Sequence, residues 1–281
     1  GRTVTVAGEA LNVAIEDLKI TGGAGVVDDF SFDGVTNAAG GLGCLGVDVD
    51  SGGGLPETFT DLSLENVLLV GNTADSVGGL FSIFCNLDVS NSEISDNSAN
   101  NNGAFVAFDG NHQFTGVDIL NNSAAAYAVG GISRWASPAT AIFDDVIVSG
   151  NFSSDSSFVF GVLYETTMTW TGTSGSMGSG IWGNDAPGGS AIQIADDSVF
   201  TASNVDFGSM DDGTGNLDLD INFLGIEYWV NRDDASFTCE DDACGSSITT
   251  TILDPSSALS NHPGQSAPLG AVFTVDSLGT L

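Results

Sequence analysis

Carboxylates are the most abundant groups in this sequence that could do chemistry, and many occur as adjacent pairs. Two carboxylates roughly 5 to 10 Å apart form the usual catalytic pair of a glycoside hydrolase. The pairs are Asp28-Asp29, Asp144-Asp145, Asp196-Asp197, Asp211-Asp212, Asp233-Asp234 and Asp241-Asp242. Neighbouring residues of a strand point to opposite faces, and these pairs fall at expected turns or edges, so we interpret them as solvated acids. A polysaccharide hydrolase is kept as the alternative function.

The chain has too few basic residues to bind most acidic ligands. The chain of 281 residues has 4 Lys and Arg against 37 Asp and Glu, a formal net charge of −33. A polysaccharide lyase needs a base beside a uronate carboxylate, and only Arg2, Lys19, Arg134 and Arg232 could help. The same charge repels nucleic acid and anionic lipid. We therefore expect a protein without a nucleic-acid partner and without enzymatic activity, and we keep lyase activity only within the alternative.

One acidic stretch, residues 211–220, has the oxygen-rich pattern of a cation-binding loop. Asp212, Thr214, Asn216 and Asp218 alternate as oxygen ligands of one Ca²⁺ ion do. The central glycine and the final glutamate of an EF-hand loop are missing from the required places. We favour a solvated acidic turn, keep Ca²⁺ as the alternative, and expect no other cofactor.

The four cysteines favour disulfides over reactive thiols. Cys239 and Cys244 enclose an acidic tetrapeptide, which disfavours a thiolate and favours a local disulfide. The Gly-apolar steps that precede Cys44 and Cys85 place these two about one repeat apart, so they could bridge neighbouring coils if their Cα atoms approach to about 7 Å. Disulfides indicate a compartment outside the cytoplasm.

Histidines and aromatic residues give weaker signals. His112 and His262 lie far from either cysteine pair, which argues against zinc, and we interpret His112, next to an asparagine, as a turn residue. Two dipeptides, Arg134-Trp135 and Tyr228-Trp229, are candidates for exposed aromatic contact with a sugar. Packing in the core or against a cap is the alternative for both.

An internal repeat must position all of these residues. Short alternating strands end at Asn72, Asn97, Asn122 and Asn151, which are 25, 25 and 29 residues apart, and each asparagine is followed by a small polar turn and a Gly-apolar step. A fixed period of this length marks a repeat architecture. A propeller needs repeats nearer to about 40 residues with four strands each.

The repeat predicts an all-β fold, a right-handed parallel β-helix with coils of about 25 residues and two or three strands per coil. Stacked coils satisfy each backbone group from the coils above and below. We expect the repeated asparagines to adopt the left-handed conformation at turns and to bond one another in a ladder. The expected inward residues are Val67, Leu69, Ile94, Val117, Ile119, Val146 and Val148. Alternation in 166–171 puts Met168 and Trp170 together on one face of their strand.

Composition changes near the end of the chain. We predict that residues 1–245 form the β-helix and that 246–281 form a tail with a final strand at 271–275.

An apolar run of about eighteen residues is lacking, so we expect no transmembrane helix. The start carries no signal peptide, which fits a mature secreted chain.

The repeat also resembles a known family. Asn72-Thr-Ala followed by Gly78-Gly79-Leu80, and Asn97-Ser-Ala followed by Gly103-Ala104-Phe105, are similar to polymorphic outer-membrane protein repeats. Val205–Ser209 and the Cys239…Cys244 ending resemble large secreted β-helix proteins of Gram-negative bacteria. The resemblance implies a right-handed parallel β-helix, secretion, a surface or adhesive role and no catalytic residues.

From these patterns we expect a non-enzymatic structural or adhesive protein, secreted or at the cell surface. Its partners would be a glycan or another surface ligand and further copies of itself. The first coil opens without a capping element, and an open strand edge invites another chain. Head-to-tail contacts of this kind build fibres.

Overall fold

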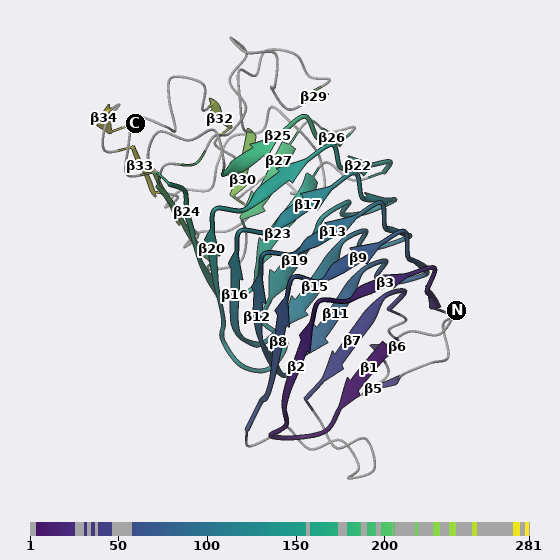
Figure 1. The fold of residues 1–281 in the computed structure, drawn as a ribbon. Coiled ribbons are helices and arrows are strands. Elements are labelled where there is room, and N and C mark those ends of the chain that lie inside the picture. Colours follow the sequence, from purple (N-terminus) through teal and green to yellow (C-terminus); the bar gives the residue numbers. More distant parts are fainter. Residues whose placement is uncertain are drawn as a thin grey trace.

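The computed structural model describes residues 4–25, 31–32, 35–36, 39–46, 58–155, 158–173, 179–186, 190–194, 198–203 and 205, together with six short strands after residue 216. Every regular element in these residues is a β-strand, and the strands stack as a parallel β-helix (Figure 1). The predicted all-β solenoid is therefore confirmed. We name its four sheets A, B, C and D in the order in which the chain visits them.

Sheets A and B are the long walls of the solenoid. Sheet A has the order β1 (Val4–Ala7), β7 (Leu42–Leu45), β11 (Leu80–Ile83), β15 (Phe105–Phe108), β19 (Gly130–Ser133), β23 (Phe158–Leu163), β27 (Ser190–Ile194), β30 (Glu227–Val230) and β32 (Thr249–Thr251). Sheet B has the order β2 (Asn12–Glu16), β8 (Thr60–Glu65), β12 (Cys85–Ser90), β16 (Gly110–Thr115), β20 (Ala139–Asp144), β24 (Thr166–Thr171), β28 (Val199–Ser203), β31 (Ser236–Cys239), β33 (Val272–Val275) and β34 (Gly279–Thr280).

Sheets C and D are narrower. Sheet C contains β3 (Lys19–Thr21), β9 (Leu68–Val70), β13 (Glu93–Ser95), β17 (Asp118–Leu120), β21 (Ile147–Ser149) and β25 (Gly180–Trp182). Sheet D contains β4 (Ala24–Gly25), β10 (Thr73–Ala74), β14 (Ser98–Ala99), β18 (Ser123–Ala124), β22 (Phe152–Ser153), β26 (Asp185–Ala186) and β29 (Leu217–Asp218). A separate hairpin pairs β5 (Ser31–Phe32) with β6 (Val35–Thr36).

A full coil has four strands, so the expectation of two or three strands was wrong. The coil from β11 to β14 visits all four sheets within one repeat. Sharp corners with positive φ make the additional strands possible because each turns the chain within one residue. At the corner between sheets B and C, these residues are Asn66, Asn91, Gly116 and Asp145.

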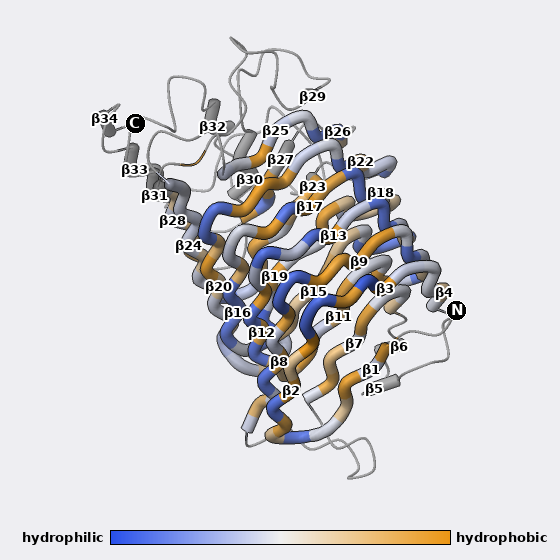
Figure 2. The backbone as a smooth tube through the Cα atoms, viewed as in Figure 1, coloured by the Kyte–Doolittle hydropathy of each residue, from blue (hydrophilic) through white to orange (hydrophobic). Residues whose placement is uncertain are grey.

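The interior is a continuous apolar stack. Every residue predicted to point inward is buried, and the face of β24 that Met168 and Trp170 share is also buried. Aromatic rings follow one another through the core, with centroids 4.9 Å apart for Phe114 and Phe143 and 5.3 Å apart for Phe143 and Trp170. Polar and apolar residues alternate along the strands (Figure 2), as expected for walls with one face inside.

Two strands of the predicted tail lie beside the solenoid. β32 pairs in parallel with β30, and β33 pairs in parallel with β31, whereas β34 turns back antiparallel to β33. These pairings extend sheets A and B past residue 245. The division of the chain at that residue stays a prediction.

A disulfide joins sheets A and B inside the core. Cys44 on β7 and Cys85 on β12 are bonded, with 6.3 Å between their Cα atoms, which confirms the predicted bridge between neighbouring coils. Cys239 is a residue of β31, and Cys244 lies outside the described residues. The predicted local disulfide between them stays a prediction.

Candidate functional site

The repeated asparagines form a buried ladder along the corner between sheets C and D. The Nδ2 atoms of Asn72, Asn97 and Asn122 each donate to Oδ1 of the next asparagine at 3.0 Å. Each Oδ1 also accepts the main-chain N–H of the preceding asparagine, at 2.9–3.0 Å. The predicted amide ladder is thus present, and it links successive coils through side chain and main chain together.

The ladder is one residue longer than the sequence predicted. Nδ2 of Asn151 donates to Oδ1 of Asn184 at 2.8 Å. The interval here is 33 residues, so the regular spacing missed Asn184. A local signal was available, because Gly183-Asn184 after a strand repeats the pattern of Gly71-Asn72 and Gly150-Asn151.

The predicted left-handed conformation belongs to a different residue. Positive φ occurs one position before each ladder asparagine, at Gly71, Asp96, Asn121, Gly150 and Gly183. The ladder asparagine itself must direct its side chain inward, where its Nδ2 also bonds a main-chain carbonyl such as that of Leu69 (2.8 Å from Asn97). The turn is therefore made by the preceding residue, and the asparagine secures it.

His112 is a core residue and not the predicted turn residue. It lies on β16 with 2% of its surface exposed, in register with Leu87 on one side and Ala141 on the other. Neither ring nitrogen of His112 has a hydrogen-bond partner. Burial lowers the pKa of His112 from 6.5 to about 4, although the nearby main chain of Asp109 opposes this shift. The imidazole is therefore neutral at pH 7.

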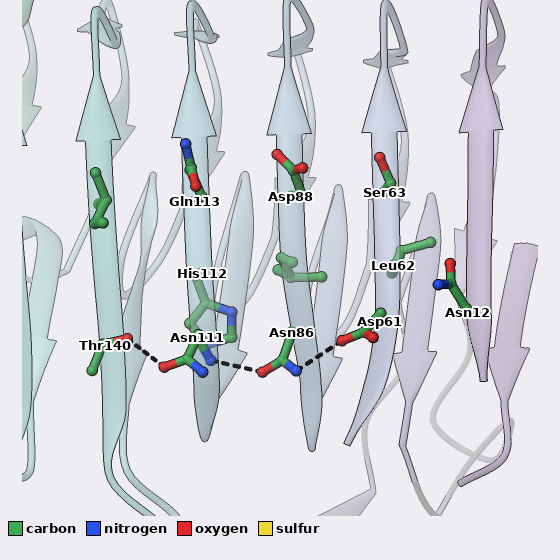
Figure 3. Close-up of a pocket in the computed structure, with 12 residues that line it drawn as sticks. Asn12, Asp61, Leu62, Ser63, Asn86, Asp88, Asn111, His112, Gln113 and Thr140 are labelled. Carbon is green, nitrogen blue, oxygen red and sulfur yellow. Dashed lines mark hydrogen bonds between the residues drawn. The ribbon is translucent and has the colours of Figure 1, made fainter. Parts of the chain in front are cut away.

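A shallow groove of about 330 Å³ runs across the outer face of sheet B (Figure 3). One row of polar residues crosses it from strand to strand. Nδ2 of Asn86 donates to Oδ1 of Asp61 at 2.8 Å, the Asn111 N–H donates to Oδ1 of Asn86 at 3.0 Å, and the Thr140 hydroxyl donates to Oδ1 of Asn111 at 2.7 Å. We call this groove the sheet B groove. The register of the strands sets the positions of the residues in this polar row.

Two carboxylates line the sheet B groove. Asp61 and Asp88 lie on neighbouring strands β8 and β12, where Asp61 is in register with Asn86 and Asp88 with Ser63. Their Cα atoms are diagonal neighbours, which corresponds to roughly 8 Å for normal strand spacing. Hydroxyl and amide groups of Ser63, Asn111 and Gln113 share the groove. This set of donors and acceptors suits a hydroxyl-rich ligand.

The predicted acid pairs do not form such a site where they are described. Asp144 accepts a hydrogen bond from the Thr171 hydroxyl at 2.9 Å, and Asp145 accepts two bonds from Thr173 at 2.6 Å. The two carboxylates thus bind different neighbours at a corner. The other predicted pairs lie outside the described residues.

Trp135 is held as an exposed aromatic residue. Both carboxylate oxygens of the buried Asp109 accept main-chain N–H groups of the loop 135–137, at 2.6–3.1 Å. The Trp135 ring is 42% exposed and packs edge-on against Phe108, 5.9 Å between centroids. Arg134 forms an ion pair with Glu165 beside it. Tyr228 and Trp229 belong to β30, and their side chains lie outside the described part.

The predicted cation site falls mostly outside the described residues: Asp212 and Asn216 are not described, and Asp218 is described only as a residue of β29. Within the described part of the chain, no three His, Cys, Asp or Glu residues cluster as metal ligands would. The residues that can be described also contain no helix long and apolar enough to span a membrane.

Comparisons with protein-family models, with curated proteins and with solved structures found no match to this chain.

Proposed function

We propose that this chain is a non-enzymatic structural or adhesive protein, secreted and displayed at a cell surface. The observation that carries the proposal is the sheet B groove, where in-register strands place a hydrogen-bonded row of polar side chains on the outer face. Its hydrogen-bonded row of Asp61, Asn86, Asn111 and Thr140 presents donors and acceptors at the strand spacing. A hydroxyl-rich polymer lying across the strands could bond several of these groups together, and weak contacts repeated along a polymer give strong retention.

Other features support the proposed extracellular location and the proposed class of ligand. The Cys44–Cys85 disulfide is typical of proteins outside the cytoplasm. The net charge of −33 keeps the surface hydrated and disfavours anionic polymers, which leaves neutral polysaccharide as the favoured target. The similarity of the repeat to polymorphic outer-membrane protein repeats belongs to the same proposal.

A retention assay tests the adhesive role. Beads coated with the protein are passed over surfaces that carry neutral polysaccharides, and the retained fraction is counted. Ser63→Trp places a bulky ring in the sheet B groove and should strongly reduce retention, whereas Thr73→Trp on sheet D should not. Absence of retention for the natural protein, or equal retention for both variants, would contradict the proposal.

Asp61 and Asp88 favour one alternative, a glycoside hydrolase. Inverting enzymes hold their carboxyl groups about 6.5–9.5 Å apart, a range that the diagonal arrangement of these two residues can meet. A hydrolase would release sugar fragments from a bound polysaccharide and would lose this activity in Asp61→Asn or Asp88→Asn.

Self-assembly is the second part of the proposal. Strands β1, β2, β3 and β4 are the last of their sheets at one end of the described solenoid. Val4, Leu11 and Leu18 are exposed there. Unpaired edges recruit strands, either from a continuing chain or from another copy. Electron microscopy with and without EDTA would show end-to-end fibres if copies associate, and isolated short rods in both conditions would contradict self-assembly.

A further inference from the structure

A second groove lies on the outer face of sheet A, where large side chains give way to glycine. In one outward row, Phe81 is in register with Val106, Val106 with Gly131, and Gly131 with Gly161. Phe81 and Val106 are buried in an apolar cluster on this outer face. Gly131, in the next coil, lines a hollow of about 330 Å³ together with Val106. We call it the sheet A groove.

Aromatic and neutral polar groups line the sheet A groove. Phe108, Tyr127 and Tyr164 contribute rings, and Asn101, Asn102 and Ser133 contribute amides and a hydroxyl. Ionised side chains are missing from its described lining. Gly131 lines the groove without a side chain, and a Cβ atom there would stand 3.0 Å from the Gly161 carbonyl oxygen.

The two tyrosine side chains differ in hydrogen bonding and in exposure. The Tyr127 hydroxyl donates to Oε1 of Gln193 at 2.9 Å, which fixes its ring. Burial raises the pKa of the Tyr127 phenol, and the proximity of Tyr164 adds to this rise. Tyr164 is 53% exposed and has a positive φ of 52°, a conformation that is unfavourable for a bulky residue. The groove thus has one fixed ring and one open ring.

We propose that the sheet A groove binds a pyranose ring of a neutral oligosaccharide, with Tyr164 as the stacking face and Asn101, Asn102 and Ser133 as partners for sugar hydroxyls. Aromatic rings suit the apolar face of a sugar, and a few placed polar groups fix its orientation. This inference rests on the proposed adhesive function and names a ligand class at a site distinct from the sheet B groove.

Other occupants fit the groove less well. An added peptide strand needs a free sheet edge, and the floor strands β15 and β19 are paired on both sides. An acidic ligand would be repelled by a chain with a net charge of −33. An alkyl chain would leave the amides of Asn101 and Asn102 without partners when it covers them, which is unfavourable.

Calorimetric titration of the full chain with neutral tetra- to hexasaccharides of glucose, mannose or N-acetylglucosamine tests this site. We expect at least one probe to bind. Tyr164→Ala should weaken it about fivefold to tenfold, and Tyr127→Phe should weaken it less. Phe152→Ala is the matched control, because Phe152 has a similar exposure of 47% and lies on sheet D away from the groove. Thermal unfolding checks that each variant folds.

The outcomes separate this inference from the proposed function. Equal affinity of Tyr164→Ala and the natural protein would overturn the sugar site, as would preference for an apolar tetrapeptide or an octyl chain. If beads are still retained through the sheet B groove in that case, the adhesive function stands without this site. If the natural protein is not retained by polysaccharide surfaces and binds none of the oligosaccharides, the sugar site and the adhesive function are both overturned.

Discussion

Asn72 and Asn97 occupy equivalent positions in consecutive coils, and Nδ2 of Asn72 lies 3.0 Å from Oδ1 of Asn97. The same oxygen accepts the main-chain N–H of Asn72, also at 3.0 Å. One side chain therefore satisfies two buried donors of the neighbouring coil. The relationship continues to Asn184 and connects the coils independently of the sheets.

Removing an internal rung should be costly. Asn97→Ala deprives the Asn72 main chain of its acceptor and the Leu69 carbonyl of its donor, so we expect a loss of at least about 3 kcal/mol in the free energy of unfolding. Asn101→Ala, at an exposed turn position, should change stability by less than about 0.5 kcal/mol. Urea unfolding measures both, and similar values for the two would show that the ladder is dispensable.

The regular part of the fold could be predicted from sequence because every coil repeats the same physical requirement. Alternation identified Val117 and Ile119 as inward residues, and the spacing identified the asparagines. The number of strands could not be predicted, since the corners depend on residues as different as Gly71 and Asp96, which share only a positive φ.

The grooves were harder to predict than the core. The sheet B groove depends on which residues from separate coils come into register, such as Asp88 beside Ser63. Trp135, for which exposure and packing were both left open, is exposed. Its anchor Asp109 lies 26 residues earlier, and nothing in the local sequence signals the contact. His112 was misassigned because a polar residue among polar neighbours gives no sign of facing a core.

The disulfide should be a major source of stability. It closes a sequence separation of 41 residues, for which the chain-entropy account gives about 4 kcal/mol. We expect the double variant Cys44→Ala/Cys85→Ala to lose about this amount in urea unfolding. The natural protein treated with a reductant should lose a comparable amount. Unchanged stability in both experiments would contradict a structural role for this bond.

His112 should make the protein sensitive to acid. The unfolded histidine binds a proton below about pH 6.5, whereas the folded one does so only near pH 4. The unfolded state therefore binds more protons between these values, and stability falls as the pH falls through this window, by up to about 3 kcal/mol. His112→Leu places a leucine in register with Leu87, as Leu62 already is on the neighbouring strand. This variant should lose the part of the pH dependence of unfolding that His112 causes. Identical pH dependence of the variant and the natural protein would contradict it.

A like-charge pair on sheet C should be mildly destabilising. Asp118 is in register with Glu93, and burial followed by the Glu93 charge raises the pKa of Asp118. Asp118→Asn should therefore stabilise the fold at pH 7 by about 0.5 kcal/mol, since solvent screens this open site. Asp88→Asn is the control, because its strand neighbours Ser63 and Gln113 are uncharged. A loss of stability in Asp118→Asn would argue for a favourable role of this carboxylate.

We propose that the protein holds a neutral polysaccharide without cutting it. The most direct test incubates the purified chain with immobilised neutral polysaccharides and measures bound protein and released reducing sugar in the same wells. We predict bound protein with no release above that of a heat-unfolded control. Release of sugar that disappears in Asp61→Asn or Asp88→Asn would contradict the account and identify the sheet B groove as the active site of a hydrolase.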